Sequence, residues 1–187
     1  MRITGGQAKG RLLAPLKGMH IRPTADQIRE TIFNIIGQDL RGLKVLDLFA
    51  GTGSLGLEAL SRGAQHVIFI DKSRQALNLI RRNLAICGFE NSGSVLRRDL
   101  CRGIPWDNPL MKDAMDLVFL DPPYGKKAIP PLIEELSSKD VLSSGSLVVA
   151  ESAKKEKLPV SLGEFHMVDT RVYGDTRISL YAYEVRK

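Results

Sequence analysis

Hydrophobic positions along this chain alternate between short unbroken runs and longer segments with helical spacing. Runs of four or five mostly apolar residues, typical of strands that are covered on both faces, occupy Lys44–Leu48, Val67–Ile70, Ser94–Arg97, Leu117–Leu120 and Leu147–Ala150. In the segments between them, apolar residues recur every three or four positions, which predicts helices over Leu55–Arg62, Arg74–Ile86 and Ile129–Leu136. This alternation indicates an α/β fold with a mostly parallel sheet between two layers of helices.

Polar residues mark the expected ends of two helices. Ser73 is a candidate N-cap for the helix Arg74–Ile86, which ends before Gly88. One face of that helix carries Ala76, Leu77, Ile80, Leu84 and Ala85. Upstream of the first strand, Thr24 or Asp26 is the candidate cap of a helix that continues to Ile36. Its inward face is expected to comprise Ile28, Ile32, Phe33 and Ile36.

The two ends of the chain depart from the alternation of strand and helix. Phe165–Val172 and Ile178–Val185 alternate polar and apolar residues around the turn Tyr173–Thr176, which predicts a closing antiparallel hairpin and seven strands in total. Residues 1–22 contain several glycines and basic side chains but no apolar periodicity. We interpret them as an arm or small hairpin, and residues 23–187 as the main domain.

Composition narrows the class of protein. The chain has 187 residues, of which 43% are hydrophobic, so one domain is expected to bury a core without disulfides or a structural metal. Cys87 and Cys101 lack the spacing of a disulfide framework or metal pair, which favours a reducing compartment. No apolar stretch is long enough to cross a bilayer, and no apolar segment typical of a secretory signal follows Arg2. We therefore expect a soluble cytoplasmic protein.

Positive charge is concentrated at the beginning of the chain. The net charge is +6, yet residues 1–23 contain five basic residues and no acidic one, which leaves the remainder almost neutral. A basic arm on a neutral globule favours an acidic partner such as nucleic acid. An ordinary polar terminus with no partner is the alternative.

A glycine-rich segment follows the first predicted strand. In Asp47-Leu-Phe-Ala-Gly51-Thr-Gly53-Ser-Leu-Gly56, the glycines allow a ligand to approach the backbone at the start of a helix. The same spacing fits a dinucleotide-binding loop, but Asp47 at the strand end would repel a pyrophosphate and attract a cationic ligand. A simple glycine turn capped by Asp47 is the structural alternative.

Acidic residues also follow the second and third predicted strands. Asp71 could accept both hydroxyls of a ribose, or it could cap the helix that begins at Arg74. Asp99 is a candidate partner for an adenine amino group, with a solvated loop acid beside Arg97 and Arg98 as the alternative.

Asp121-Pro-Pro-Tyr124, after the fourth predicted strand, is the strongest chemical signal in the chain. The exocyclic amine of a nucleobase is a poor nucleophile because its lone pair is conjugated with the ring. A carboxylate and a backbone carbonyl that each accept one N–H could turn the lone pair toward a methyl donor. The prolines would fix the Pro122 carbonyl in the site, and Tyr124 could stack on an extruded base. The structural alternative is a proline loop with an incidental acid and aromatic ring.

These motifs resemble those of the bacterial 16S rRNA guanine-N2 methyltransferase family that modifies guanine 966. The match extends over nearly the whole chain and includes Gly5-Gly-Gln7 with Lys9-Gly-Arg11, Arg22-Pro-Thr24, Arg29–Asn34, Asp47–Gly53, Leu57–Leu60, Asp71, Asn83-Leu84, Asp121–Tyr124, Glu151-Ser152 and Tyr173–Thr176. The resemblance implies a Rossmann-like methyltransferase fold, S-adenosylmethionine as cofactor, and 16S rRNA or a partly assembled small subunit as partner. A monomer without metal is expected.

The resemblance also implies a role for each candidate site residue. Catalytic positions would be Asp121, Pro122, Pro123 and Tyr124. Cofactor-binding positions would be Arg22, Thr24, Arg29, Asp47, Phe49, Gly51, Gly53, Asp71 and Asp99. RNA-binding positions would be Arg2, Lys9 and Arg11.

Three other functions fit parts of the pattern. DNA adenine-N6 methyltransferases use a similar loop, but they normally carry a separate target-recognition region, and the core here fills almost the whole chain. A dinucleotide oxidoreductase is disfavoured by Asp47 and the Pro-Pro loop. A non-catalytic RNA-binding protein is disfavoured by the intact Asp121 and glycine loop.

Overall fold

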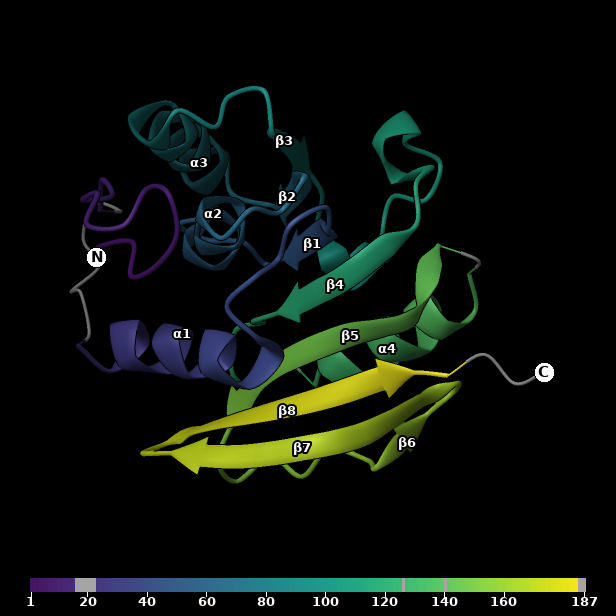
Figure 1. The fold of residues 1–187 in the computed structure, drawn as a ribbon. Helices are drawn as coiled ribbons and strands as arrows, with labels where there is room; N and C mark the ends of the chain where they lie inside the picture. The colour runs from purple at the N-terminus through teal and green to yellow at the C-terminus, as the bar shows by residue number, and fades with distance from the viewer. Residues whose placement is uncertain (16–22, 126, 140, 185–187) are drawn as a thin grey trace.

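A computed structural model describes residues 1–15, 23–125, 127–139 and 141–184. Its centre is one eight-stranded sheet with strand order β3-β2-β1-β4-β5-β8-β7-β6 (Figure 1). The strands are β1 (Lys44–Leu48), β2 (His66–Asp71), β3 (Gly93–Arg97), β4 (Met115–Leu120), β5 (Leu142–Ala153), β6 (Ser161–Leu162), β7 (Phe165–Tyr173) and β8 (Thr176–Tyr183). The first five are parallel, and the last three are antiparallel. The predicted α/β architecture is confirmed. The sheet has eight strands instead of the predicted seven, because β6 has only two residues and is too short to show an alternation of polar and apolar positions.

Helices cover both faces of the sheet. Three of them lie on one face, namely α1 (Pro23–Ile36), α2 (Ser54–Ser61) and α3 (Arg74–Cys87), whereas α4 (Ile129–Ser137) lies on the other (Figure 1). Alternate strand residues supply the two cores. Val45 and Phe119 belong to the core under α1–α3, whereas Leu46 and Val118 belong to the core under α4. Phe33 of α1 contacts Phe119 edge to face, with 5.9 Å between ring centroids.

The helix ends partly follow the sequence prediction. Ser73 caps α3 as predicted, because its side chain accepts the Ala76 N–H, and Gly88 ends the helix in the left-handed conformation. The prediction that Ala85 faces inward is wrong. Ala85 is exposed and Cys87 is buried, because the buried stripe of α3 continues from Leu84 to the next turn. Helix α1 begins at Pro23, before both predicted caps.

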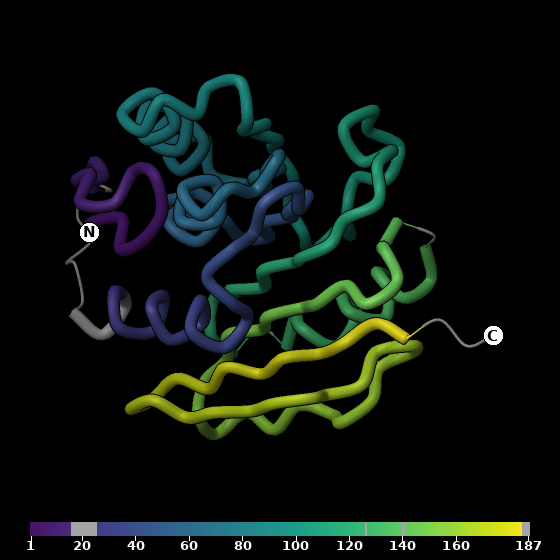
Figure 2. Tube along the Cα trace, viewed as in Figure 1, coloured from purple at the N-terminus to yellow at the C-terminus, as the bar shows by residue number. Residues whose placement is uncertain are grey.

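Residues 1–14, here called the N-terminal hairpin, fold back on themselves and pack against the domain (Figure 2). Ile3 N–H donates to the Arg11 carbonyl at 3.0 Å, and Arg2 and Leu12 form an antiparallel bridge. The apolar side chains Ile3, Ala8 and Leu13 are buried in the core under α1 and α2. The prediction of an arm or small hairpin covered residues 1–22, of which 16–22 lie outside the described residues.

The five parallel strands end at one edge of the sheet, where the predicted chemical residues gather. The chain goes from β1 to β2 on one side, and β4 lies on the other side of β1. A crevice for ligands is expected at such a point, outside the carboxyl ends of the strands. In the described part of the chain, each helix is too short or too polar to cross a membrane.

Candidate active site

The loop between β1 and α2 has an unusual backbone. Phe49, Gly51 and Gly53 all have positive φ, at 62°, 55° and 76°. Positive φ is strained for a residue with a side chain, and at Phe49 this conformation marks a loop of defined shape at the crevice. Gly53 also begins α2 without a side-chain cap, so the first N–H groups of the helix face the loop.

Asp47 is the penultimate residue of β1, just before this loop. Its side chain is buried, and one carboxylate oxygen accepts the Gly56 N–H at 3.0 Å. Burial raises the pKa of Asp47 to about 7; the nearby Asp71 charge adds to this rise, and the Gly56 hydrogen bond opposes it. No basic side chain of the described residues forms an ion pair with Asp47. A buried carboxylate in this state favours a cationic ligand.

Asp71 and Asp99 both hold backbone groups. The Asp71 carboxylate accepts the N–H of Gly51 at 3.0 Å and that of Ser73 at 2.8 Å, so it joins the glycine loop to the start of α3. Asp99 accepts the Cys101 N–H at 3.2 Å and begins a 3₁₀ turn, Leu100–Arg102; this hydrogen bond lowers the pKa of Asp99. Asp71 thus holds the backbone of Ser73, which itself caps α3, and Asp99 caps the 3₁₀ turn. Their contacts with a cofactor stay predictions.

The Asp121–Tyr124 segment leaves β4 at the same edge. Pro122 is buried, whereas Pro123 is exposed and Tyr124 is 47% exposed. The Tyr124 hydroxyl donates to Glu151 Oε1 at 3.1 Å and lies 2.9 Å from Thr176 Oγ1. Strands β5 and β8 therefore hold the outer end of the ring in place while its faces stay accessible.

Three carboxylates share one sheet face near this edge, namely Asp47, Asp121 and Glu151. Asp47 is the penultimate residue of β1, Asp121 directly follows β4, and Glu151 directly follows the part of β5 that pairs with β4. They share a face because Leu48 pairs with Leu120 and Leu120 with Ala150. The Asp121 side chain is exposed to solvent, yet the protein atoms around it, followed by the charges of Glu151 and Asp47, raise its pKa well above the usual value. Burial also raises the pKa of Glu151.

Sequence reasoning did not assign a role to Glu151. The only signal was its position, since it directly follows the apolar run Leu147–Ala150 as Asp71 follows Val67–Ile70. The family resemblance includes Glu151-Ser152 but implies no role for Glu151, and the relation of this residue to Asp121 depends on strand order.

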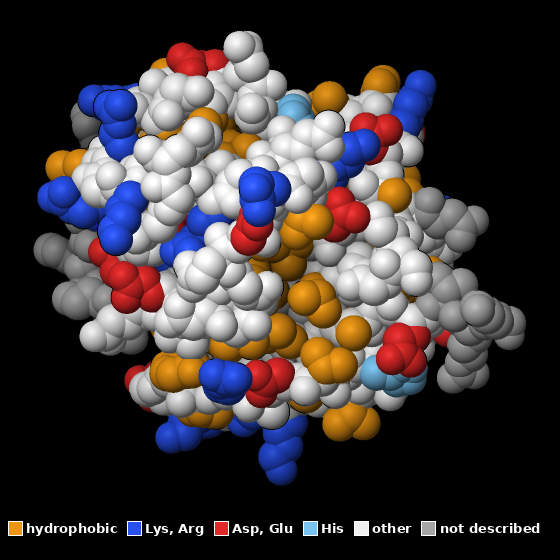
Figure 3. Space-filling model, viewed as in Figure 1, with side chains coloured by type: hydrophobic (Ala, Val, Ile, Leu, Met, Phe, Trp, Pro, Cys, Tyr) orange, Lys and Arg blue, Asp and Glu red, His pale blue; other side chains and the backbone are white. Residues whose placement is uncertain are grey.

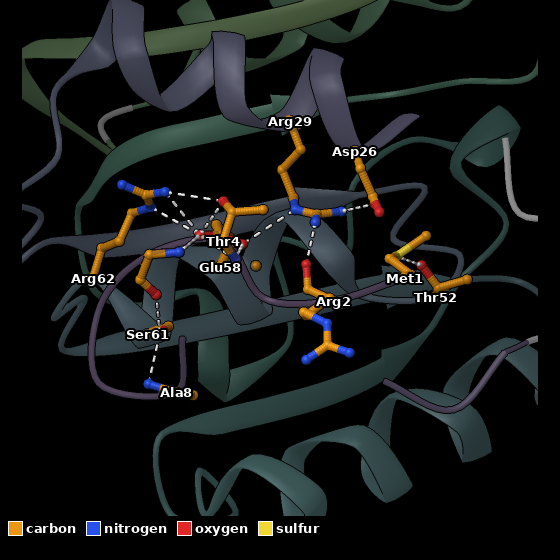
Figure 4. A network of polar contacts seen from close by, with 12 residues as sticks. Met1, Arg2, Thr4, Ala8, Asp26, Arg29, Thr52, Glu58, Ser61 and Arg62 are labelled. Atoms are coloured by element: carbon orange, nitrogen blue, oxygen red, sulfur yellow. Dashed lines mark hydrogen bonds and ion pairs between the residues drawn. The ribbon is translucent and has the colours of Figure 1, made fainter. Parts of the chain in front are cut away.

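Arg29 lies in a buried polar network that Figure 4 shows from close by. Its Nε donates to Glu58 at 3.1 Å, its Nη1 to Asp26 at 3.1 Å, and its Nη2 to the Arg2 carbonyl. The Glu58 carboxylate also accepts the N–H groups of Thr4 and Gly5 and pairs with Arg62. These contacts join the N-terminal hairpin to α1 and α2, and the predicted contact of Arg29 with a cofactor is not among them.

Two other predicted residues cannot be placed in the site. Arg22 lies outside the described residues, and the side chain of Thr24 is likewise not described although its backbone belongs to α1. Their contacts with a cofactor stay predictions.

The N-terminal hairpin also contacts the glycine loop. Asn83 of α3 is buried; its Oδ1 accepts the Ala14 N–H at 2.8 Å, and its Nδ2 donates to the Thr52 carbonyl at 3.3 Å. The Thr52 hydroxyl lies 3.7 Å from the sulfur of Met1 (Figure 4). The predicted RNA-contact side chains Arg2, Lys9 and Arg11 are all exposed on this hairpin. Figure 3 shows basic side chains gathered on the same side, over the hairpin and α3.

Comparisons with known proteins match nearly the whole chain. A family model described as "Conserved hypothetical protein 95" matches residues 1–182. The chain is 35% identical over 181 residues to "Putative rRNA methyltransferase YlbH" of Bacillus subtilis, covering 97% of this chain and 98% of that protein. It is 31% identical to "Ribosomal RNA small subunit methyltransferase D" of Escherichia coli, covering 100% of this chain and 91% of that protein. The solved structure of "Putative methyltransferase yhhF from Escherichia coli" has a TM-score of 0.84 at 30% identity, covering 100% of this chain and 99% of that one.

Proposed function

Because this chain belongs to the family described as conserved hypothetical protein 95, we propose that it transfers a methyl group from S-adenosylmethionine to small-subunit (16S) ribosomal RNA. The acceptor is the N2 amine of a guanine, and the family resemblance indicates guanine 966. The names of the two relatives supply the reaction class. The observation that carries the proposal is the position of Asp121–Tyr124 beside the glycine loop, at the carboxyl edge of the parallel strands.

The residues around the glycine loop fit the cofactor. When bound, S-adenosylmethionine supplies a sulfonium methyl group, and its methionyl part carries a positive amine. The buried carboxylate of Asp47 suits that positive charge, and the backbone of Gly51 is open to a ligand, because a Cβ there would meet only the Phe49 carbonyl oxygen, at 3.8 Å. Asp71 keeps lone pairs for ribose hydroxyls in addition to its two backbone contacts. The resemblance adds Phe49 and Asp99 to this pocket and places Arg22, Thr24 and Arg29 near the cofactor carboxylate.

Asp121 and Pro122 suit the orientation of a base amine. The Asp121 carboxylate and the Pro122 carbonyl would each accept one N–H, which turns the nitrogen lone pair away from the ring and toward the methyl group. After transfer, the amine loses a proton, and the raised pKa of Asp121 makes this carboxylate a competent acceptor. Tyr124 offers an accessible ring for stacking on the base.

Substitution of Asp121 tests the assigned chemistry. Asp121→Ala should reduce transfer of labelled methyl groups to 16S rRNA by about a hundredfold or more, because one N–H acceptor and the proton acceptor are lost together. Its dissociation constant for the cofactor, measured by calorimetry, should stay close to that of the native protein. Asp107→Ala, which removes an exposed loop acid, is the matched control. Undiminished transfer by the Asp121 variant would reject the assignment.

The target is tested by mapping the methylated base. Ribosomal RNA from cells with the gene should carry N2-methylguanine at position 966, and RNA from cells without it should not. Purified protein should methylate this RNA or a partly assembled subunit but leave duplex DNA unmodified. Methylation of adenine in duplex DNA would instead favour a DNA methyltransferase.

A further inference from the structure

We propose that Glu151 selects guanine, by accepting the N1–H of the same base whose N2 amine is held by Asp121. This inference rests on the proposed function, because it assigns base recognition within that site. It adds a specificity-determining residue for which the sequence motif gives no role.

The sheet places the two carboxylates side by side. In the β4–β5 pairing, Leu120 lies opposite Ala150, so the residues that follow them, Asp121 and Glu151, continue the same register. Neighbouring strands are about 4.8 Å apart. Phe119 and Val149, two residues earlier on each strand, both belong to the core under α1–α3, so Asp121 and Glu151 share this face.

Tyr124 orients the Glu151 carboxylate. The Tyr124 hydroxyl donates to Glu151 Oε1 at 3.1 Å, and Thr176 Oγ1, at 2.9 Å from the same hydroxyl, completes the chain of hydrogen bonds. Within the described residues, no hydrogen bond reaches the second oxygen of Glu151, nor either oxygen of Asp121. A base stacked on the accessible Tyr124 ring would therefore meet two adjacent carboxylates that have acceptor capacity left.

This pair of acceptors matches the edge of guanine. Guanine presents two adjacent donors, N1–H and N2–H, whereas adenine has a lone pair at N1. With guanine, each carboxylate receives one N–H. With a base that lacks the N1 hydrogen, the Glu151 oxygen would face a lone pair and stay unpaired in a partly desolvated site, and such a mismatch is strongly disfavoured.

A bracing role for Tyr124 is the competing explanation of Glu151. If Glu151 only holds the Tyr124 ring, its loss should impair every base that stacks there to the same degree. If Glu151 recognises N1–H, its loss should impair guanine more than a base without that hydrogen. The ratio between two substrates separates these roles, whereas a single rate does not.

The test uses two short RNAs that differ only at the target base, guanine or 2-aminopurine. 2-Aminopurine keeps the exocyclic 2-amine but has no hydrogen on N1. The native protein should prefer guanine by about a hundredfold in kcat/KM. Glu151→Gln should reduce this preference at least tenfold, mainly by slowing guanine, while cofactor affinity measured by calorimetry is retained. Tyr124→Phe keeps the carboxylate but removes the hydroxyl that orients it, so this variant should lower the preference for guanine by less than Glu151→Gln does.

The outcomes separate the inference from the function beneath it. An unchanged preference in Glu151→Gln would overturn the role in specificity and assign Glu151 to bracing. No N2-methylguanine from the native protein would overturn the proposed function and the inference with it. Should the glutamine variant not fold, Glu151→Asp withdraws the carboxylate by one methylene and should also lower the preference for guanine; an undiminished preference in that variant would contradict the role.

Discussion

At the scale of single residues, Gly53 controls the shape of the glycine loop between β1 and α2. Its φ is +76°, and a Cβ there would lie 3.0 Å from Ile80 Cγ1. Gly53→Ala should lower the free energy of unfolding by about 1–2 kcal/mol, because of backbone strain and the close contact. The displaced loop should weaken cofactor binding at least tenfold. Urea unfolding and calorimetric titration of the cofactor measure the two effects.

Gly88 provides the matched control for this substitution. Its φ is +77°, but a Cβ there would meet nothing within 4 Å, and it ends α3 outside the loop. Gly88→Ala should show similar backbone strain and normal cofactor affinity. Equal affinities in the two alanine variants would reject the placement of the cofactor at Gly53.

Asp47 should make stability depend on pH. Its folded-state pKa of about 7 lies above the ordinary value of 3.8 for an aspartate, so the folded protein binds the proton more tightly than the unfolded chain does. The tighter binding of this proton therefore stabilises the folded protein fully below about pH 4, and this stabilisation is lost as the pH rises through 7. Asp47→Asn should therefore stabilise the protein at pH 8 relative to pH 4, by on the order of a few kcal/mol. Urea unfolding at both pH values measures this change, and an equal effect at both would contradict the raised pKa.

At the scale of elements, the strands were easier to predict from the sequence than the N-terminal hairpin. The mostly apolar segment Lys44–Leu48 was predicted as a strand, and it coincides with β1. The hairpin is held by only a few buried apolar side chains and by the Glu58 network, whose members look like surface residues in the sequence. Strand β5 extends beyond Leu147–Ala150 because its pairing with β8 continues to Ala153 through Glu151 and Ser152, which carry no apolar signal.

Glu58 should be essential for docking of the hairpin. Its carboxylate is fully buried and pairs with Arg29 and Arg62 while it accepts two backbone N–H groups of the hairpin. Glu58→Gln leaves the buried Arg62 guanidinium without its counter-charge and Arg29 with Asp26 alone, so it should destabilise the protein by about 3–5 kcal/mol. Urea unfolding measures the loss, and protease cleavage within residues 1–14 reports undocking.

The exposed pair Asp39–Arg41 is the control for this prediction. Both side chains are largely exposed, so Asp39→Asn should leave the urea midpoint unchanged. A Glu58 variant that behaves like the Asp39 variant would show that the network does not hold the hairpin.

At the scale of the whole molecule, the site combines residues that are distant in the sequence. Motifs predicted Asp47 and Asp121, because a glycine loop and a Pro-Pro segment directly follow them. Glu151 could not be assigned, since its position beside Asp121 depends on the pairing of β4 with β5. The link from the N-terminal hairpin through Asn83 to Thr52 also depends on tertiary packing alone. Local patterns thus single out individual candidate residues, whereas the contacts that bring those residues together depend on tertiary structure.

The location of the basic side chains leads to a prediction about RNA binding by the whole molecule. Arg2, Lys9 and Arg11 project from a hairpin that contacts the glycine loop, so RNA bound there would lie beside the site. Replacing all three with Ala should weaken binding to 16S rRNA and reduce the slope of log affinity against log salt by about two to three. The slope falls because each phosphate that is no longer contacted keeps its counterions when the protein binds. Filter binding at several salt concentrations measures both quantities, and cofactor affinity should not change. The matched control replaces three exposed basic residues outside the hairpin, Arg41, Lys112 and Lys139. It removes the same charge, and it should leave the slope of log affinity against log salt nearly unchanged. A fall in turnover with unchanged affinity and slope would instead mean that the hairpin positions RNA held by another surface.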